Sequence, residues 1–426
     1  MKNHIFRNIH LLLALVLVGC SSLAPLLSPP TSVPALEATS TPLAIPIPTP
    51  TAPATDRSRL LRIWLPPRFD PNTGTPSGDL FKARLQEFQS EYPSINIEIR
   101  IKSDIDILNT LAVTNLAAPE AMPDLIALSY SDMQEIAAAG FLHPLDGLTA
   151  VLEDPDWYAF ARELGHVQST EYGIPFASDV LLTVYRASVF VEPPSTWETI
   201  FQSGTSMVFP PSDPNALFSL SLYRSEVGQL VDEQGAVLLN EDALVRLLSF
   251  HKQALDNETV LPVIRDYQTD SQTLQFYREG NADLAVIWAA SDIQTISGEY
   301  THLLGLGDNP YALGNGWVWA LAGSDLEIQP LAAELASYFV DSKFMAEWTR
   351  SAGYLPTRPQ ALAGWDDETL RGSIDNVLQS AHPIPSQDVV SIMGSTLQKA
   401  LIRIFNGEQP EIVARSVIEN SKLSLG

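Results

Sequence analysis

The sequence predicts an α/β protein in which mixed, mostly parallel sheets are flanked by helices and the globular part divides into two domains. Short apolar or alternating runs that suit β-strands are followed, again and again, by stretches whose apolar residues recur at helical spacing. This alternation is typical of sheets with helices on both faces. Residues 59–426 are long enough for two domains, and 45% of the chain is hydrophobic, which is a globular composition.

The first 19 residues have the pattern of a signal peptide. Lys2 and Arg7 give a positive start, and residues 11–18 form an apolar run that is too short to span a bilayer. The sequence Leu-Val-Gly-Cys that follows resembles a bacterial lipobox, in which the cysteine thiol receives a diacylglycerol because a thiolate is the nucleophile. Cys20 is the only cysteine in the 426 residues, so it has no disulfide partner. We therefore expect export and lipidation at Cys20, the alternative being an ordinary secretory signal with a chance cysteine.

Residues 20–58 are rich in proline, serine and threonine and read as a linker. Proline removes backbone donors and favours extended polyproline-II structure, so this segment cannot form a packed core. At ~3.1 Å per residue its reach is on the order of 100 Å. We expect the segment to tether the globular part to the extracytoplasmic face of the cell membrane.

The net charge of −25 excludes one class of partner. A strongly acidic surface is repelled by nucleic acid and by anionic lipid headgroups, so we expect no nucleic-acid partner. No apolar run after the signal approaches eighteen residues, so the sequence predicts no further membrane span.

The first domain is predicted to begin with a buried strand at 60–65 and a Pro/Gly/Asn-rich loop at 66–78. A helix follows, with apolar residues at Phe81, Leu85, Phe88 and Tyr92. The isoleucines of 95–101 alternate strictly and predict a second strand. A helix near 107–111, a strand at 124–129 and a helix from an Asp132 N-cap to Gly140 complete this part of the pattern.

The second domain shows the same alternation from about residue 193. We expect strands at 207–209, 236–239, 282–288 and 316–321. Helices are predicted after an N-cap at Asn240, at 273–279, and through Leu331, Leu335 and Phe339. The segment 387–423 reads as two helices separated by Gly407.

Eight sequence pieces, in order, carry a family resemblance that runs from about residue 60 to about residue 420. They are EFQSEYPSINIEI, LAAPEAMPDLIAL, EIAAAGFLHPLDGL, EYGIPFASDVLLTVYRASVF, PPSTWETI, FYREGNADLAVIW, GNGWVWAL and GYLPTRPQAL. Together they resemble the family 1 extracellular solute-binding proteins of bacterial ABC importers, the group that includes maltose- and multiple-sugar-binding proteins. Arg186 departs from the pattern, since the family usually has asparagine there, and this weakens the transfer of any ligand contact to that position.

The resemblance implies a two-lobed periplasmic-binding-protein type II fold with the ligand cleft between the lobes. The expected crossings lie near 185–190, 305–315 and 355–358. Lobe 1 would then comprise 59–185 plus 316–355, and lobe 2 would comprise 190–305 plus 358–426. Closure of such lobes about a hinge is a known response to ligand. The resemblance also implies a monomer that delivers a small solute to the permease subunits of an ABC transporter, with no cofactor.

Candidate ligand-binding residues come partly from position and partly from the resemblance. In open α/β sheets ligands lie outside the carboxyl ends of strands, which points to Trp64, Ser129, Tyr130 and Trp288. A neutral sugar needs flat aromatic faces for its rings and carboxylates or amides for its hydroxyls. We expect stacking and hydrogen bonding from Trp288 and Trp317, then Tyr130, Trp64 and Tyr354, with Asp179 as acceptor and Asn315 and Arg358 as donors.

Each candidate has a structural alternative. A tryptophan in a strand is often a core residue, which applies to Trp64 and Trp319 in particular. Asp179 can serve a turn or a helix cap, and Arg358 can pair with a neighbouring acid.

Catalysis and metal binding find little support in the sequence. It contains no H-E-x-x-H, G-x-S-x-G or G-x-x-x-x-G-K motif and no cysteine pair, and its histidines are scattered. The Asp70-x-Asn72-x-Gly74 pattern lacks the closing acid of a calcium loop and reads as a turn. We expect a binding protein with no metal and no enzymatic activity. The alternatives are a glycoside hydrolase, a surface receptor for a sensor protein, and a binding protein for a non-sugar solute such as a polyamine or a glycerol phosphate.

Overall fold

Strands from both predicted domains join one mixed sheet in the computed structural model, which describes residues 59–296, 298–323 and 325–424. Nine strands of this described part pair in the order β2-β1-β3-β10-β6-β8-β7, with β11 against β10 and β9 against β6. The strands are β1 (Arg59–Leu65), β2 (Ile95–Ile101), β3 (Leu125–Ser129), β6 (Gly173–Tyr185), β7 (Met207–Val208), β8 (Leu284–Trp288), β9 (Glu299–Thr301), β10 (Ala312–Leu321) and β11 (Ala381–Pro383), with a separate hairpin of β4 (His166–Val167) and β5 (Thr170–Glu171).

Fourteen α-helices cover the sheet in the described residues. They are α1 (Pro76–Glu91), α2 (Ile107–Ala117), α3 (Tyr130–Ala138), α4 (Ala159–Glu163), α5 (Trp197–Gln202), α6 (Leu217–Val227), α7 (Glu241–Asp256), α8 (Asp270–Arg278), α9 (Gln329–Tyr338), α10 (Ser342–Ala352), α11 (Pro359–Ala363), α12 (Glu368–Gln379), α13 (Gln387–Phe405) and α14 (Pro410–Ser424).

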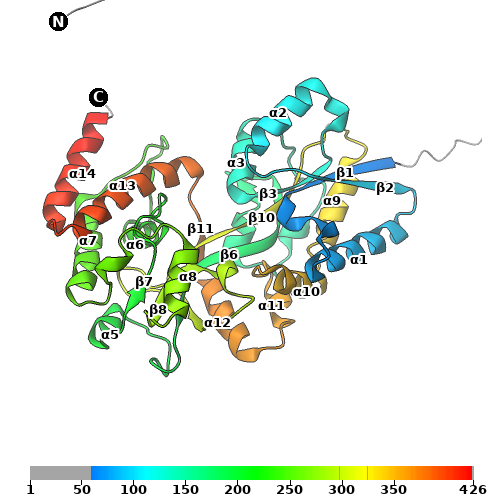
Figure 1. The fold of residues 1–426 in the computed structure, drawn as a ribbon. Coiled ribbons are helices and arrows are strands. Elements are labelled where there is room, and N and C mark those ends of the chain that lie inside the picture. The colour runs from blue at the N-terminus through cyan, green and yellow to red at the C-terminus, as the bar shows by residue number, and fades with distance from the viewer. Residues whose placement is uncertain (1–58, 297, 324, 425–426) are drawn as a thin grey trace, which may run out of the picture. The chain divides into compact units, whose positions relative to one another are not determined.

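We call β1–β3 with α1, α2, α3 and α9 the first half (Figure 1). β1 lies parallel to both β2 and β3, as a strand–helix–strand sequence requires. α1 begins after the Thr75 N-cap, whose hydroxyl accepts from Gly78 N, and it buries Phe81, Leu85 and Phe88 against the sheet. The helical spacing of these three residues therefore predicted the buried face of α1 correctly.

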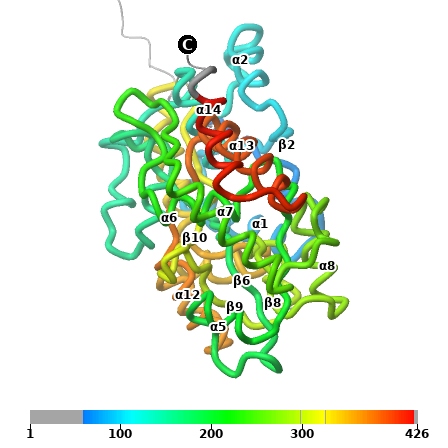
Figure 2. The backbone as a smooth tube through the Cα atoms, turned by 90° about the vertical axis from the view of Figure 1, so that its left-hand side faces the viewer, coloured from blue at the N-terminus to red at the C-terminus, as the bar shows by residue number. Residues whose placement is uncertain are grey.

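The second half consists of β7 and β8 with α5 to α8, α13 and α14 (Figure 1). β7 and β8 are parallel. α13 and α14 pack on each other and on α7, and Figure 2 shows the three together from a second direction. α7 follows the predicted N-cap, because the Asn240 side chain accepts from Ala243 N. Gly407 has a positive φ of 88° between α13 and α14, which suits the predicted break.

Two long strands, β6 and β10, run from one half to the other (Figure 1). β6 pairs antiparallel with β10 through residues 173–180 and with β8 and β9 through residues 181–185. Close packing explains the glycines of β10. A Cβ on Gly316 would lie 2.7 Å from the Ala177 carbonyl oxygen, and one on Gly314 would lie 2.6 Å from the Phe160 ring.

The structure differs from the sequence predictions at three places. The N-cap of α3 is Ser129, whose hydroxyl accepts from Asp132 N, so the prediction of an Asp132 N-cap is wrong by three residues. The predicted strand at 236–239 is wrong, because Val237 forms only an isolated bridge to Val231. The sequence patterns also missed several elements, including α5, α6, α10, α12 and β6. β6 is apolar and buried along most of its length and so has no alternation. The predicted signal, Cys20 and most of the linker lie outside the described residues.

Candidate functional site

Asp179 occupies the point where β6 changes partners. It lies opposite Asn315 of β10, and Leu181, two residues on, already pairs with Trp288 of β8. Its Oδ1 accepts hydrogen bonds from Val180 N (3.0 Å) and from Ala290 N (2.9 Å), just beyond β8. Burial raises the pKa of Asp179 to about 7, and repulsion from Asp270 adds to this. The carboxyl group can therefore change its charge near neutral pH.

Two further carboxylates come from the second half. Asp270, at the start of α8, accepts from Trp288 N (2.7 Å) and from the Ser291 hydroxyl (3.0 Å), and so fixes the end of β8. Asp213, in the loop after β7, accepts from the backbone N–H of Asn215 and of Leu217 (3.0 Å each). Burial raises the pKa of both groups, and repulsion from Asp213 adds to the rise at Asp270. Backbone N–H groups thus hold both carboxylates in place, and the two carboxylates are near enough to repel each other.

Trp288 lies beside Asp270, and its side chain is partly exposed. It is the last residue of β8, and its backbone is fixed by Asp270. A ring at the carboxyl end of a parallel strand lies where ligands of α/β sheets bind. Trp288 can therefore offer a flat face to a ligand beside the Asp179 and Asp270 carboxylates.

The loop after β1, strand β10 and the segment after α10 contribute an aromatic and cationic group. The Arg68 guanidinium lies 4.8 Å from the centre of the Trp317 ring, and Arg68 donates to the Tyr354 hydroxyl (3.3 Å) and to Asp104 (3.1 Å). Phe69 packs edge-on against Trp317 at 5.0 Å. Burial raises the pKa of Tyr354, hydrogen bonds from Arg68 and Trp317 partly offset this, and repulsion from the Asp179 carboxylate raises it further. Tyr354 and Asp179 therefore lie near enough for their charges to interact.

The arrangement suits a neutral, polyhydroxylated ligand. Aromatic side chains provide faces for sugar rings, while carboxylates accept from hydroxyl groups and Arg68 donates to them. Five of the residues predicted from sequence lie around this point: Asp179, Trp288, Asn315, Trp317 and Tyr354. The Asn315 side chain accepts from Gly316 N (2.8 Å), and the Trp317 ring is largely covered, with 8% of the residue exposed.

The other predicted residues have structural roles. Trp64 is 1% exposed in the core, as is Trp319. The Ser129 hydroxyl caps α3 and contacts Asp132. Arg358 is 6% exposed; it forms ion pairs with Asp154 and Asp156 and donates to Val340 O (2.9 Å).

Tyr130 lies on the other face of the two long strands β6 and β10, here called the hinge strands. It lines a hollow with residues of α4, and α4 packs on the face of β10 that holds Gly314 and Gly316, opposite Trp317. We therefore leave Trp64, Ser129, Tyr130 and Arg358 out of the site.

Sequence reasoning missed Arg68, Asp213 and Asp270. The strand-end rule that selected Trp288 also applies to the loops after β1 and β7, which hold Arg68 and Asp213. Asp270 carried no such signal, because it lies at the start of a helix. Its contribution is the hydrogen bond that it accepts from Trp288 N at the end of β8.

Other features of the described residues add no chemistry to this site. Among them there is no group of three or more His, Cys, Asp or Glu side chains able to hold a metal ion. Within the same ranges no helix is both long and apolar enough to cross a bilayer. Arg186 donates to Ala282 O (3.1 Å) and its guanidinium lies over the Tyr277 ring, so it has a packing role.

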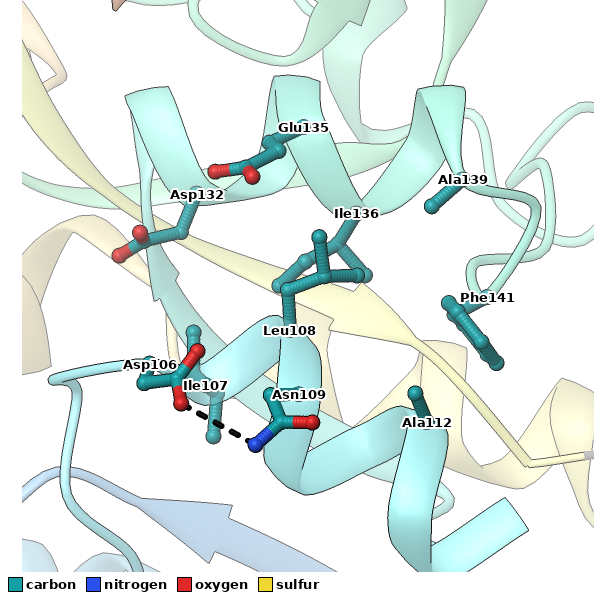
Figure 3. Close-up of a pocket in the computed structure, with 10 residues that line it drawn as sticks. All are labelled: Asp106, Ile107, Leu108, Asn109, Ala112, Asp132, Glu135, Ile136, Ala139 and Phe141. Atoms are coloured by element: carbon teal, nitrogen blue, oxygen red, sulfur yellow. Dashed lines mark hydrogen bonds between the residues drawn. The ribbon is translucent and has the colours of Figure 1, made fainter. Parts of the chain in front are cut away.

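A separate hollow of about 430 Å³ lies between α2 and α3 (Figure 3). Apolar side chains such as Leu108, Ile136 and Phe141 line it beside carboxylates. Asp106 accepts from the Asn109 amide there (3.1 Å), so part of its polar lining is satisfied internally.

Residues 83–371 match the family described as bacterial extracellular solute-binding protein. A curated relative, the maltotriose-binding protein of Pyrococcus abyssi (strain GE5 / Orsay), is 26% identical over 122 residues, which are 28% of this chain and 26% of that protein. The match thus spans about a quarter of the relative's length.

Solved structures agree over far more of the chain. The sugar-binding protein MalE from Xanthomonas citri has a TM-score of 0.70 at 15% identity, over 85% of this chain and 96% of that one. Maltose-bound MalE3 of T. maritima has a TM-score of 0.62 at 18% identity, over 85% and 99%. A Staphylococcus aureus extracellular solute-binding protein in complex with maltose has a TM-score of 0.70 at 13% identity, over 86% and 98%. These likenesses confirm the predicted two-lobed α/β fold.

Proposed function

The chain belongs to the bacterial extracellular solute-binding protein family, and we propose that it captures a neutral oligosaccharide of the maltodextrin type for an ABC importer. The observation that carries the proposal is the pair of carboxylates, Asp179 and Asp270, that bind the backbone at the end of β8 beside Trp288. The Arg68–Tyr354 pair adds a donor, and the Asp179 charge acts on Tyr354. Stacking faces and fixed carboxylates are the groups that a neutral sugar requires. Relatives of the same fold are maltose- and maltotriose-binding proteins.

The proposed mechanism is closure of two lobes over the ligand. We place the boundaries within the long strands, between Val180 and Leu181 in β6 and at 314–316 in β10, where the pairing partners change. Each lobe then supplies part of the site, so the ligand makes all its contacts only when both lobes approach it. A ligand with higher affinity for the closed state shifts the population towards it.

The ligand is best identified by calorimetry with maltose and maltotriose. We expect binding by the wild-type protein, weaker binding by Trp288→Ala, and unchanged binding by Phe201→Ala, a half-buried aromatic of α5 outside the site. Absence of any heat with both sugars, in a folded protein, would contradict the assignment to maltodextrins. Unchanged sugar after long incubation is the expected result if the protein only binds, and release of glucose would show hydrolysis instead.

The carboxylates favour a second candidate, a polyamine. Asp179, Asp213 and Asp270 lie near one another, and Arg68 already pairs with Asp104. A linear polycation would favour the ionised form of all three carboxylates and would be attracted by their charges. Titration with spermidine distinguishes the two ligands: tight spermidine binding together with no maltotriose binding would favour the polyamine.

We also propose that the mature protein is held at the extracytoplasmic membrane face by a lipid on Cys20. The support is the Leu-Val-Gly-Cys sequence and the Pro/Ser/Thr-rich linker that follows it. Expression of wild type and Cys20→Ser in a bacterial host, followed by membrane fractionation, tests this. We expect the wild-type protein in the membrane fraction and the variant outside it, and equal partition of the two proteins would contradict the anchor.

A further inference from the structure

We propose that the hollow on the opposite face of the hinge strands, here called the back groove, binds a small oxyanion such as a carboxylate or a phosphate. The groove has a volume of about 580 Å³ and takes its lining from both halves. Tyr130, Gln134 and Arg162 come from the α3 and α4 side. Arg224 of α6 and Pro383 to Ser386, which lead into α13, come from the other side.

The groove brings together two arginines without acidic partners. Arg162 donates to Asp154 O (2.6 Å) and Arg224 donates to Pro383 O (2.6 Å). Each guanidinium thus uses one of its N–H groups to bind a backbone carbonyl. The ion pairs within the described ranges include neither arginine. Glu163 is the only carboxylate among the described residues that line the groove, and it is exposed. The lining is thus net positive in a chain of net charge −25, and such a local field concentrates anions.

Two buried polar atoms at the groove have no partner. Arg162 Nε and Gln134 Oε1 are both shielded from solvent and make no hydrogen bond to another described group. A buried unsatisfied donor costs about 1–3 kcal/mol, so a turn of the Arg162 side chain towards an acceptor in the groove would recover that cost. Arg162 Nε calls for an oxygen acceptor. Gln134 would face the same acceptor with its N–H₂ group after its amide is flipped, because the unpartnered atom is its carbonyl oxygen.

The start of α13 adds a second kind of anion-attracting group. Ser386 lines the groove as the N-cap of this 19-residue helix, and its side chain makes no capping hydrogen bond. The first-turn N–H groups of α13 therefore lack that cap, and they lie at the positive end of the helix dipole. With Arg162 and Arg224, they suit an anion with at least two acceptor oxygens.

Because residues of both halves line the back groove, an anion that contacts both should bind best at one relative angle of the halves. By linkage, an anion with such a preference changes the affinity of the site on the other face, and a ligand in that site changes the anion's affinity by the same factor. This second step, unlike anion binding itself, depends on the proposed function.

The experiment titrates the full-length protein with sodium phosphate and, separately, with sodium succinate, against sodium chloride at equal ionic strength. Calorimetry and thermal unfolding are the readouts. We expect at least one oxyanion to bind and to raise the unfolding temperature. Arg224→Gln should weaken that binding about tenfold or more, since it removes a charge-assisted donor. The matched control is Arg246→Gln, which changes an exposed arginine of α7 that pairs with Glu226. This variant should bind the oxyanion with the same affinity as the wild type.

Several outcomes would overturn the site. No oxyanion binding beyond that of chloride would do so, and so would an equal loss in Arg246→Gln, which would indicate a general charge effect. Arg224→Lys keeps the charge and reports on the site if the glutamine variant is unfolded, because it should retain part of the affinity. Comparison of phosphate with succinate decides between the two anion classes.

Maltotriose titration with and without the saturating anion tests the coupling. A changed maltotriose affinity supports it, and an unchanged one contradicts it. If maltotriose fails to bind at all, the proposed function fails, while the Arg224→Gln result still decides the anion site.

Discussion

Replacement of Asp179 by asparagine should stabilise the protein in a pH-dependent way. The pKa of this carboxyl group is about 7 in the folded protein against an ordinary value of 3.8, because the group is largely buried and lies near Asp270. The folded state therefore holds the proton more tightly than the unfolded chain does. Between about pH 4 and pH 7 the stability must fall as the pH rises, and above pH 7 the full cost of the charge is present.

The size of the effect follows from the two pKa values. A difference of about 3 pKa units corresponds to on the order of 4 kcal/mol, which is an upper bound because structural relaxation and water reduce it. Asparagine has the same shape, and its Oδ1 can keep the hydrogen bonds from Val180 N and Ala290 N. We expect the variant to match the wild type near pH 4 and to be more stable by about 1–4 kcal/mol at pH 8.

Urea unfolding at pH 4.5, 6 and 8, followed by tryptophan fluorescence, measures this difference. Asp256→Asn is the matched control, because it is the same substitution at an exposed carboxylate that pairs with Lys252. The reasoning would be refuted by a difference between Asp179→Asn and the wild type that is the same at all three pH values.

Three other substitutions test separate parts of the structure. Trp288→Ala should weaken maltotriose binding by about 2 kcal/mol, or about 30-fold in Kd by calorimetry, if its half-exposed ring stacks on the sugar; an unchanged Kd would remove Trp288 from the site. Gly316→Ala should lower the free energy of unfolding, measured in urea, by about 1–3 kcal/mol, because its Cβ would lie 2.7 Å from a carbonyl oxygen. The control is Gly372→Ala, in open space within α12, which should raise the free energy of unfolding by about 0.5–1 kcal/mol. Arg358→Met should cost about 3 kcal/mol of stability by leaving Asp156 unpaired, with the maltotriose Kd unchanged; a loss of affinity in a folded Arg358→Met protein would return Arg358 to the site.

Local sequence patterns were sufficient for most helices and strands. The spacing of Phe81, Leu85 and Phe88 predicted the buried face of α1, and the alternating isoleucines of 95–101 predicted β2. Where local patterns failed, a tertiary contact decided. β6 is buried through contacts with β10 and β8, which lie more than a hundred residues further along the chain, so its sequence carries no period.

The candidate site was predictable only where a rule ties function to position. Trp288 followed from the carboxyl end of a strand, and Asp179 followed from the family resemblance. Arg358 also lies in a motif of the family resemblance. Its guanidinium, however, is used by Asp154 and Asp156, some two hundred residues earlier in the sequence. Nothing in the spacing of these residues indicates that pairing, because the fold alone brings them together.

If the two halves close about the ligand as proposed, the placement of Asp179 links its hydrogen bonds to their relative position. Its backbone belongs to the part of β6 that pairs with β10, whereas the Ala290 N–H that it binds follows β8 in the second half. A change in the angle between the halves must alter this hydrogen bond or the exposure of the carboxyl group, and either change moves its pKa. Ligand binding that closes the halves should therefore take up or release a proton near pH 7. The heat of maltotriose binding in two buffers of different ionisation enthalpy measures that proton, and equal heats in both buffers would show that Asp179 does not sense closure.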